Sequence, residues 1–224
     1  MLKKLMLAFF ICLLFACRNT PEGNFGTFAD DFVTEYSALF PDETPLSIDN
    51  EKLALLPPPT VGYLNSVRQF HVRFSKALKN FDLKNLPPNA ARDARKAGNI
   101  LKTVGTYLND YQRNPQRFNV LHGFRRILAA DYASDEFRLK TMLSKLEKVP
   151  NFYATAKAQL RDVDRADADA AVTSHVETYL FFDEILPNFL KEKSQLTPQY
   201  QTHLEAARLA IKDYAAFVES FRLQ

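Results

Sequence analysis

Cysteine is nearly absent from this sequence. The 224 residues include two cysteines, no tryptophan and six glycines. Cys12 and Cys17 both lie near the N-terminus, so the rest of the chain can form neither an internal disulfide nor a thiolate metal site. The fold must therefore rest on packing alone. Scarce glycine, abundant Ala, Leu, Lys and Arg, and prolines grouped between segments favour helices joined by short corners.

The sequence also lacks an excess of charge of one sign. It contains 29 basic and 26 acidic residues, and without residues 1–16, which include Lys3 and Lys4 but no acid, these counts become 27 and 26. A nearly neutral chain has no electrostatic reason to seek nucleic acid, and no basic run is interleaved with aromatics. We therefore predict that nucleic acid is not a partner.

No apolar run is long enough to span a membrane. The segment from Leu5 to Ala16 is apolar throughout, but it has about a dozen residues where a spanning helix needs about 20. The polar residues 18–22 follow almost at once. Lys3 and Lys4 precede the apolar run, and a small residue, Ala16, ends it. This arrangement is typical of a secretory signal peptide.

The end of this segment, Leu14-Phe15-Ala16-Cys17, resembles the lipobox of bacterial lipoproteins. In that family the cysteine is acylated, the bond before it is cut, and the lipidated cysteine becomes the first residue. The resemblance implies a signal peptide over 1–16, a palmitate-type modification at Cys17 and a lipidated tether over 17–24. It also implies attachment to membrane lipid in the cell envelope, with the outer membrane as the expected location.

Two other interpretations of this segment are weaker. Cys12 follows Phe10 and Ile11, which are too bulky for the small pocket of a signal peptidase. Ordinary secretory cleavage near Cys17 would leave a lone free thiol in an oxidising compartment. Cys17 is therefore the predicted lipidation site.

From Phe25 onward, apolar residues recur at three- and four-residue steps, which is the helical period. No segment alternates in the manner of a strand with a hairpin signal. The sequence therefore predicts an all-α fold of about seven helices joined by Pro-marked corners, as a single helical domain over residues 25–224. The expected helices cover about 25–39, 60–79, 90–111, 115–130, 134–149, 151–160, 168–193 and 198 onward, with caps at Thr60, Asn114, Ser134, Asp164 or Asp167, and Thr197, and a kink or break at Pro187.

The four histidines, His71, His122, His175 and His203, are far apart in the sequence. A helical zinc pair needs two histidines four residues apart, with a glutamate after the first, and no His-Glu-x-x-His occurs. A histidine and a glutamate two residues apart point to different helix faces. We therefore expect surface or half-buried histidines rather than metal ligands.

The acid-rich residues 162–169 superficially resemble a calcium-binding loop. Counting from Asp162, however, Ala166, Asp167 and Thr173 stand where an oxygen ligand, a glycine and a glutamate are needed. These acids fit better in the first turn of a helix, where the macrodipole favours negative charge.

Two further groups of charged residues also have plain explanations. Asp183 and Glu184, beside Phe181-Phe182, fit the edge of a core. Four arginines are expected on the surfaces of helices, unless the fold brings them together into one cluster. The sequence has neither a glycine-rich phosphate loop nor a Gly-x-Ser-x-Gly elbow. It therefore predicts no catalytic residue, no cofactor and no metal site. The four arginines are Arg68, Arg73, Arg125 and Arg126.

Three helical segments, residues 28–41, 138–160 and 204–217, are similar to a large bacterial family known as domain of unknown function 885, many of whose members are exported or lipid-anchored. Its members are typically far longer, and their C-terminal part carries a His-Glu-x-x-His helix that resembles a zinc metallopeptidase. This sequence ends before such a part. The resemblance therefore implies the helical N-terminal region alone, and no catalytic residue carries over to it.

The leading interpretation is a non-enzymatic, membrane-tethered lipoprotein whose helical domain binds an unknown protein or small molecule. The alternative is an accessory or truncated subunit of a zinc metallopeptidase-like hydrolase, with its zinc half encoded separately. A third interpretation is a degraded relative without activity of its own.

Overall fold

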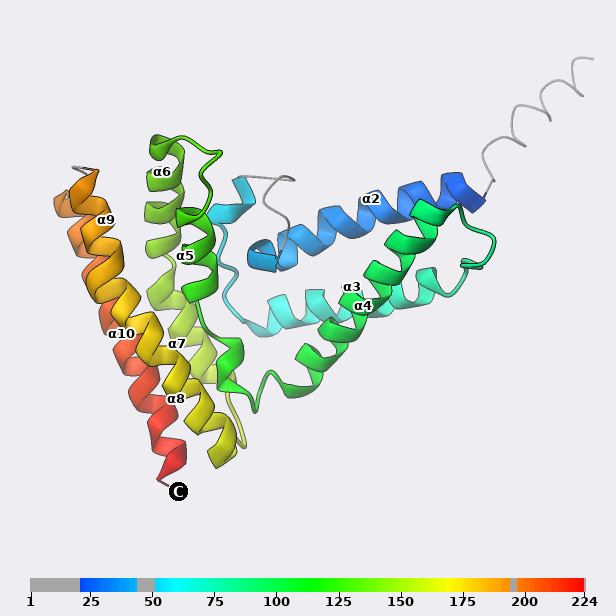
Figure 1. The fold of residues 1–224 in the computed structure, drawn as a ribbon. Coiled ribbons are helices and arrows are strands. Elements are labelled where there is room, and N and C mark those ends of the chain that lie inside the picture. The colour runs from blue at the N-terminus through cyan, green and yellow to red at the C-terminus, as the bar shows by residue number, and fades with distance from the viewer. Residues whose placement is uncertain (1–20, 44–50, 194–196, 224) are drawn as a thin grey trace, which may run out of the picture. The chain divides into compact units, whose positions relative to one another are not determined.

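The structure, a computed structural model, describes residues 21–43, 51–193 and 197–223 (Figure 1). The regular elements in these ranges are all helical, and no strand occurs in them, so the predicted all-α class is confirmed. The elements are α2 (Pro21–Leu39), η1 (Pro41–Glu43), η2 (Glu51–Ala54), α3 (Val61–Leu78), α4 (Pro88–Asp110), η3 (Pro115–Arg117), α5 (Leu121–Leu128), α6 (Asp135–Leu146), α7 (Val149–Gln159), α8 (Arg165–Leu180), η4 (Phe181–Ile185), α9 (Leu186–Glu192) and α10 (Pro198–Arg222).

Side-chain caps start four of these helices at the predicted residues. The side-chain oxygens of Thr60, Ser134, Asp164 and Thr197 accept hydrogen bonds from the backbone amide three residues later, at 3.0, 3.2, 2.8 and 3.4 Å. Each bond satisfies one of the amides that the first turn of a helix leaves free. Asp167, the other candidate cap, lies in the first turn of α8 instead.

The helix predicted over 115–130 is wrong in part, because it is interrupted. Asn114 is a cap as expected, and its side chain accepts from the amide of Gln116 at 3.0 Å, but it caps only the short 3-10 turn η3. The chain then leaves the helix, and the Asn119 side chain accepts from the amide of Leu121 at 2.9 Å. A side chain that bonds its own backbone competes with the helical ladder and begins a new element, here α5.

The helix that contains Pro187 is not broken there. It is widened into a π-helical turn just before this residue. The five residues of η4 form a π-helical turn between α8 and α9, and α9 begins with proline in its first turn. Because Pro187 has no amide hydrogen, it leaves a carbonyl in the preceding turn without its helical donor. The Arg208 side chain of α10 donates to two carbonyl oxygens of this preceding turn. The distance is 3.0 Å to that of Phe182 and 2.8 Å to that of Asp183. A side chain from a neighbouring helix thus satisfies the turn.

Backbone contacts group the chain into two compact units. Unit 1 comprises Met1–Tyr36 and Arg68–Gly105, and unit 2 comprises Ser37–Val67 and Thr106–Gln224. The single helical domain expected over 25–224 stays a prediction, because two compact units of one chain can unfold either together or separately.

The core of unit 1 is built from phenylalanine, which explains why this residue is so frequent. The ring centroids of Phe28 and Phe74 lie 5.6 Å apart, and those of Phe32 and Phe70 lie 5.2 Å apart. Since the later residue of α2 meets the earlier residue of α3, the two helices run antiparallel. The spacing of four residues places both rings of each helix on one face.

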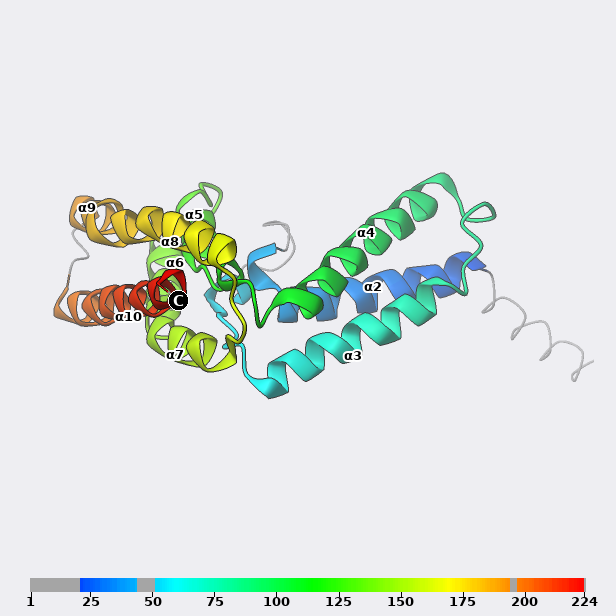
Figure 2. The same cartoon turned by 90° about the horizontal axis from the view of Figure 1, so that it is seen from below.

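α4 lies against α3 at Gly98 and at Gly105, and the approach is tight only at Gly105. A Cβ on Gly98 would contact the Leu78 side chain at 3.6 Å, and a Cβ on Gly105 would lie 3.1 Å from the His71 ring. The pairing of residue 71 with 105 and of 78 with 98 shows that α3 and α4 are also antiparallel (Figure 2). α3 therefore contacts both of the other helices of unit 1.

In unit 2, α10 contacts α6, α7, α8 and η4 (Figures 1 and 2). Its buried residues recur at helical spacing, so a single stripe faces the core. Its members are Tyr200, Leu204, Ala207, Ile211, Tyr214 and Val218.

Candidate functional site

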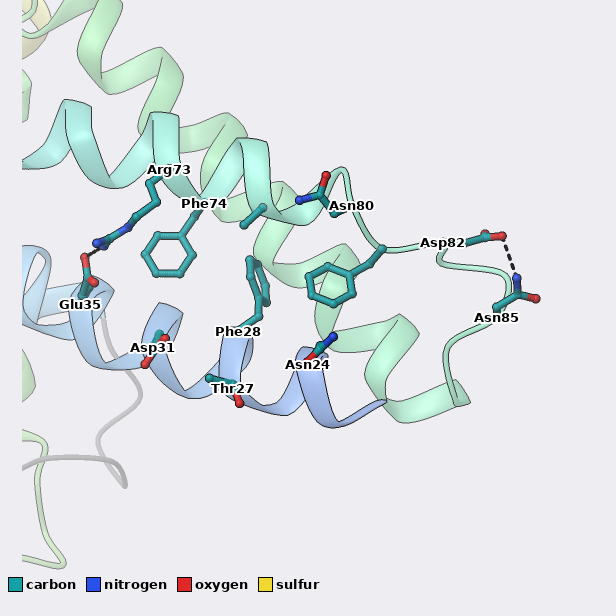
Figure 3. A pocket seen from close by; sticks show the side chains of 12 residues that line it. Asn24, Thr27, Phe28, Asp31, Glu35, Arg73, Phe74, Asn80, Asp82 and Asn85 are labelled. Atoms are coloured by element: carbon teal, nitrogen blue, oxygen red, sulfur yellow. Dashed lines mark hydrogen bonds and ion pairs between the residues drawn. The ribbon is translucent and has the colours of Figure 1, made fainter. Parts of the chain in front are cut away.

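A groove of about 730 Å³ opens on unit 1 (Figure 3). Its walls come from α2, from the C-terminal half of α3 and from the connection that leads to α4. This volume is in the range of small-molecule sites, about 300–1,000 Å³. Its lining consists of Asn24, Thr27, Phe28, Asp31, Glu35, Arg73, Phe74, Ala77, Asn80, Phe81, Asp82 and Asn85.

Three aromatic rings form the apolar part of the groove. Phe28 makes edge-to-face contacts with Phe74 at 5.6 Å and with Phe81 at 5.3 Å between centroids. Phe28 and Phe74 are buried, whereas Phe81 is half-buried. The helical period that builds the core of unit 1 therefore also places Phe28 and Phe74 in the wall of the groove, and Phe81 of the connection is the more exposed ring beside them.

The polar part of the groove contains three carboxylates and one cation. Arg73 forms an ion pair with Glu35, and its guanidinium lies 4.8 Å from the centroid of the Phe74 ring. Asp82 is used within its own turn, where it accepts from the Lys84 amide at 3.0 Å and from the Asn85 side chain at 2.9 Å. The remaining carboxylate belongs to Asp31, which is exposed.

The reactive groups of this lining are mainly carboxylates. The twelve lining residues include no Cys, Ser, His, Lys or Tyr, and Thr27 supplies the only hydroxyl group. Carboxylates can contact a ligand or take part in catalysis as a nucleophile or a base. Sequence reasoning missed the groove because its residues lie on helices whose pairing the sequence does not show.

Three of the four histidines lie at the surface or are half-buried, as expected. His71 is half-buried against Gly105, and His122 is exposed, with its Nε2 3.1 Å from the carbonyl oxygen of Asp42. The Nε2 atom of His203 lies 3.5 Å from a Glu147 oxygen. Within the part of the chain that the structure describes, no group of three or more His, Cys, Asp or Glu could hold a metal ion. The absence of a metal and of a cofactor stays a prediction.

The expectation of a surface or half-buried histidine is wrong at His175, whose exposed fraction is 2%. α8 turns its ring inward between Tyr153 of α7 and Tyr214 of α10, at 5.9 and 5.0 Å between centroids. Nδ1 lies 2.8 Å from the Ala171 carbonyl oxygen, while Nε2 forms no hydrogen bond of regular geometry with any described residue. Burial lowers the pKa of His175 and outweighs two nearby backbone carbonyls, which raise it.

The unfolding free energy should therefore fall on acidification through the titration of His175. The unfolded chain binds this proton near pH 6.5 and the folded chain only at lower pH, so stability is lost as the pH drops below 6.5. The facing groups, Tyr153 and Tyr214, have pKa values raised by burial and stay neutral. We expect a loss of about 1–2 kcal/mol between pH 7 and 5.

Urea unfolding at several pH values checks this expectation. The variant His175→Leu should show a shallower decrease in unfolding free energy between pH 7 and 5 than the parent. The variant His122→Gln removes an exposed ring and should keep the parent's pH dependence. Equal slopes for the parent and His175→Leu would contradict the assignment.

The expectation that the acids of residues 162–169 lie in the first turn of a helix holds in part, because α8 begins at Arg165 and Asp162 lies before it. Asp164 caps the helix, and Asp167 lies in its first turn. Asp169 pairs with Arg222 at the end of α10. Burial and the nearby Asp164 raise the pKa of Asp167. Asp164 thus begins α8, and Asp169 links α8 to α10 through an ion pair.

The other charged groups lie near the core edge or the surface. Asp183 pairs with Arg208 at 3.1 Å, while its aromatic neighbours are buried. Arg68 and Arg125 are exposed. Arg126 differs, because it is half-buried and donates to the Pro41 carbonyl at 3.1 Å and to that of Asp42. It helps to hold η1 against α5.

A buried ion pair in unit 2 was missed by sequence reasoning. The Lys145 side chain is 0% exposed, and its Nζ pairs with the Asp42 carboxylate and donates to the Leu53 carbonyl at 3.3 Å. Burial lowers the pKa of Lys145, and Asp42 opposes this effect. A Cβ on Gly123 would overlap the same carboxylate, so only glycine leaves room for Asp42 there.

The predicted lipidation site lies outside the described residues. Cys17, the signal peptide over 1–16 and the tether up to residue 20 are not covered, whereas Pro21–Asn24 already belong to α2. Among the helices that are described, none is both long and apolar enough to cross a membrane.

Comparisons with known proteins support the fold class. The chain is similar in structure, over most of its own length, to part of a larger protein. That protein is a candidate lipoprotein of unknown function from Shewanella oneidensis, with a TM-score of 0.73, 21% identity, and a match that covers 89% of this chain and 38% of the other. No family model matches the sequence, and no curated protein matches it. At this identity the similarity shows the fold, and membership of family 885 stays a prediction.

Proposed function

We propose that this chain is a bacterial lipoprotein held in the cell envelope by acylated Cys17, with the outer membrane as its location. In this proposal residues 1–16 are removed as a signal peptide. The lipobox-type ending at Cys17 supports it, and so does the description of the similar Shewanella oneidensis protein as a candidate lipoprotein. The three segments that resemble family 885, many of whose members are lipid-anchored, agree with this assignment.

We further propose that the helical part is a non-catalytic binding module and that the groove of unit 1 is its ligand site. The observation that carries this proposal is the combination of an aromatic surface with a polar rim in one concave site of ligand size. Apolar area supplies affinity, and a few placed polar groups supply orientation. No cofactor is part of this proposal.

Filling the groove should abolish ligand binding. Ala77 lies in the groove lining, so Ala77→Trp would place an indole where a ligand sits, whereas Val72→Trp adds the same group at an exposed position of α3 outside it. We expect neutral aromatic fragments to shift the backbone NMR signals of Thr27 and Asn80 in the chain from residue 17 onward carrying Cys17→Ser, which lacks the apolar run over residues 5–16 and needs no detergent. The effect should survive Val72→Trp and disappear with Ala77→Trp.

Two results would contradict this binding site. One is a fragment library that leaves the groove signals unchanged in the parent. The other is a set of shifts that Ala77→Trp and Val72→Trp affect equally, because binding would then occur elsewhere.

The alternative proposal is an accessory or truncated subunit of a zinc metallopeptidase-like hydrolase. One observation favours it: the similar protein is much longer than this chain, and the match spans 38% of it. The two proposals differ in a measurable respect. An accessory subunit raises the rate of peptide hydrolysis when it is mixed with a zinc-binding partner, whereas a binding module does not.

A further inference from the structure

The helix that forms one wall of the groove carries charge of only one sign. The 19 residues of α2 include Glu22, Asp30, Asp31 and Glu35, and no lysine or arginine. Asp31 and Glu35 are four residues apart, so they lie on the same helix face and repel each other. Both line the groove.

Of these two carboxylates, only that of Glu35 is paired with a cation of the groove lining. Arg73 is the one basic residue of the lining, and it already pairs with Glu35. Asp31 makes no ion pair with any residue in the described ranges. In Figure 3 the two acids lie along α2, with Arg73 reaching Glu35 from α3. The groove thus keeps an uncompensated negative charge beside its aromatic surface.

Arg73 also shows how this site holds a cation. Its guanidinium contacts a carboxylate on one side and lies 4.8 Å from the Phe74 ring centroid on the other. Both contacts favour positive charge. Phe28 precedes Asp31 by three residues on α2, so a ring and a carboxylate lie side by side there as well. This second pair has no cation of its own among the described residues.

We propose that the groove binds a small primary amine that carries a short apolar or aromatic body. Its ammonium group lies at Asp31, and its body lies against Phe28 and Phe74. The inference rests on the proposed binding function and adds the class of ligand. An anion of the same shape is disfavoured, because Arg73 is already engaged and the other charged groups of the lining are acids.

Three probes of nearly equal shape test this inference: 4-phenylbutylamine, 4-phenylbutanol and 4-phenylbutyrate. Dissociation constants would be measured by NMR titration of the chain from residue 17 onward carrying Cys17→Ser, which lacks the apolar run over residues 5–16. We expect the amine to bind about threefold to fivefold more tightly than the alcohol, and the carboxylate most weakly. The preference for the amine should shrink at 0.5 M NaCl, because exposed charges are screened.

A matched pair of variants assigns the preference to one carboxylate. Asp31→Asn removes the charge in the groove with little change of shape, and Asp30→Asn removes an equally exposed charge on the next residue, outside the lining. We expect Asp31→Asn to bring the amine and the alcohol to within about twofold of each other. Asp30→Asn should retain most of the preference.

The possible failures are distinguishable. If the alcohol binds the parent as tightly as the amine, the groove binds ligands but does not select amines, and this inference is wrong while the proposed function stands. If Asp30→Asn and Asp31→Asn lower the preference equally, the general field of α2 and not this site is responsible. If none of the probes binds at the groove, the inference and the proposed binding site both fail.

Discussion

The chain from residue 17 onward, exported with Cys17→Ser behind an ordinary cleavable signal peptide, should move from the detergent phase to the aqueous phase in a detergent-partitioning experiment, because it keeps neither the acyl chains nor the apolar run over residues 5–16. A lipoprotein carries two or three acyl chains on its first residue, and each buried methylene contributes about 0.8 kcal/mol to membrane attachment. The remaining chain has 27 basic and 26 acidic residues, so electrostatic attraction to lipid cannot replace the acyl chains. The expected change is nearly complete transfer, measured by immunoblotting both phases after expression in a bacterium that processes lipoproteins.

The second cysteine supplies a matched control. Cys12 lies within the apolar run, where serine leaves the signal peptide and the lipobox intact, so Cys12→Ser should remain in the detergent phase and incorporate a labelled palmitate analogue. A Cys17→Ser protein that still enters the detergent phase would exclude the proposed anchor. Equal loss of labelling in both variants would point to a defect in export instead.

The buried ion pair of unit 2 should respond asymmetrically to the loss of either partner. We expect Asp42→Asn to lower the free energy of unfolding by about 2–4 kcal/mol, and Lys145→Met by about 1 kcal/mol or less. Lys145 is 0% exposed, whereas the Asp42 side chain retains 23% exposure. Without Asp42, the buried ammonium group of Lys145 has no counter-charge. It must then either lose its proton or move into solvent. Without Lys145, the carboxylate keeps part of its hydration, and methionine fills the space of the lysine stem.

Urea unfolding at pH 7 measures both effects. The double variant Asp42→Asn/Lys145→Met should resemble Lys145→Met alone, because the uncompensated charge is then gone. Glu43→Ala alters an exposed residue of the same turn and should change the unfolding free energy by less than about 0.5 kcal/mol. A greater cost for Lys145→Met than for Asp42→Asn would show that packing, not charge, dominates at this site.

The elements that could be predicted from sequence are those determined locally. Thr60, Ser134, Asp164 and Thr197 each bond an amide three residues away, so their identity is enough to start a helix. The apolar stripes likewise follow from a repeat that is visible along one segment, such as that of α10.

The features that sequence reasoning missed depend on distant partners. Asn119, which begins α5, also accepts from the Thr178 hydroxyl at 2.9 Å, so its role depends on α8. The burial of Lys145 needs Asp42, more than a hundred residues earlier in the chain. The groove needs the pairing of α2 with α3. A local pattern contains none of this information, because the same periodicity is compatible with many helix pairings.

The antiparallel contact between His71 and Gly105 bears on the order in which the chain folds. Unit 2 is discontinuous, because residues 68–105 of unit 1 interrupt it. Once α3 and α4 pair, the two points where the chain leaves and re-enters unit 2 are held close together. Shortening the effective loop about tenfold lowers the entropic cost of closing it by about 2 kcal/mol. We therefore expect Gly105, which allows this close approach, to affect the rate at which unit 2 assembles, although it belongs to unit 1.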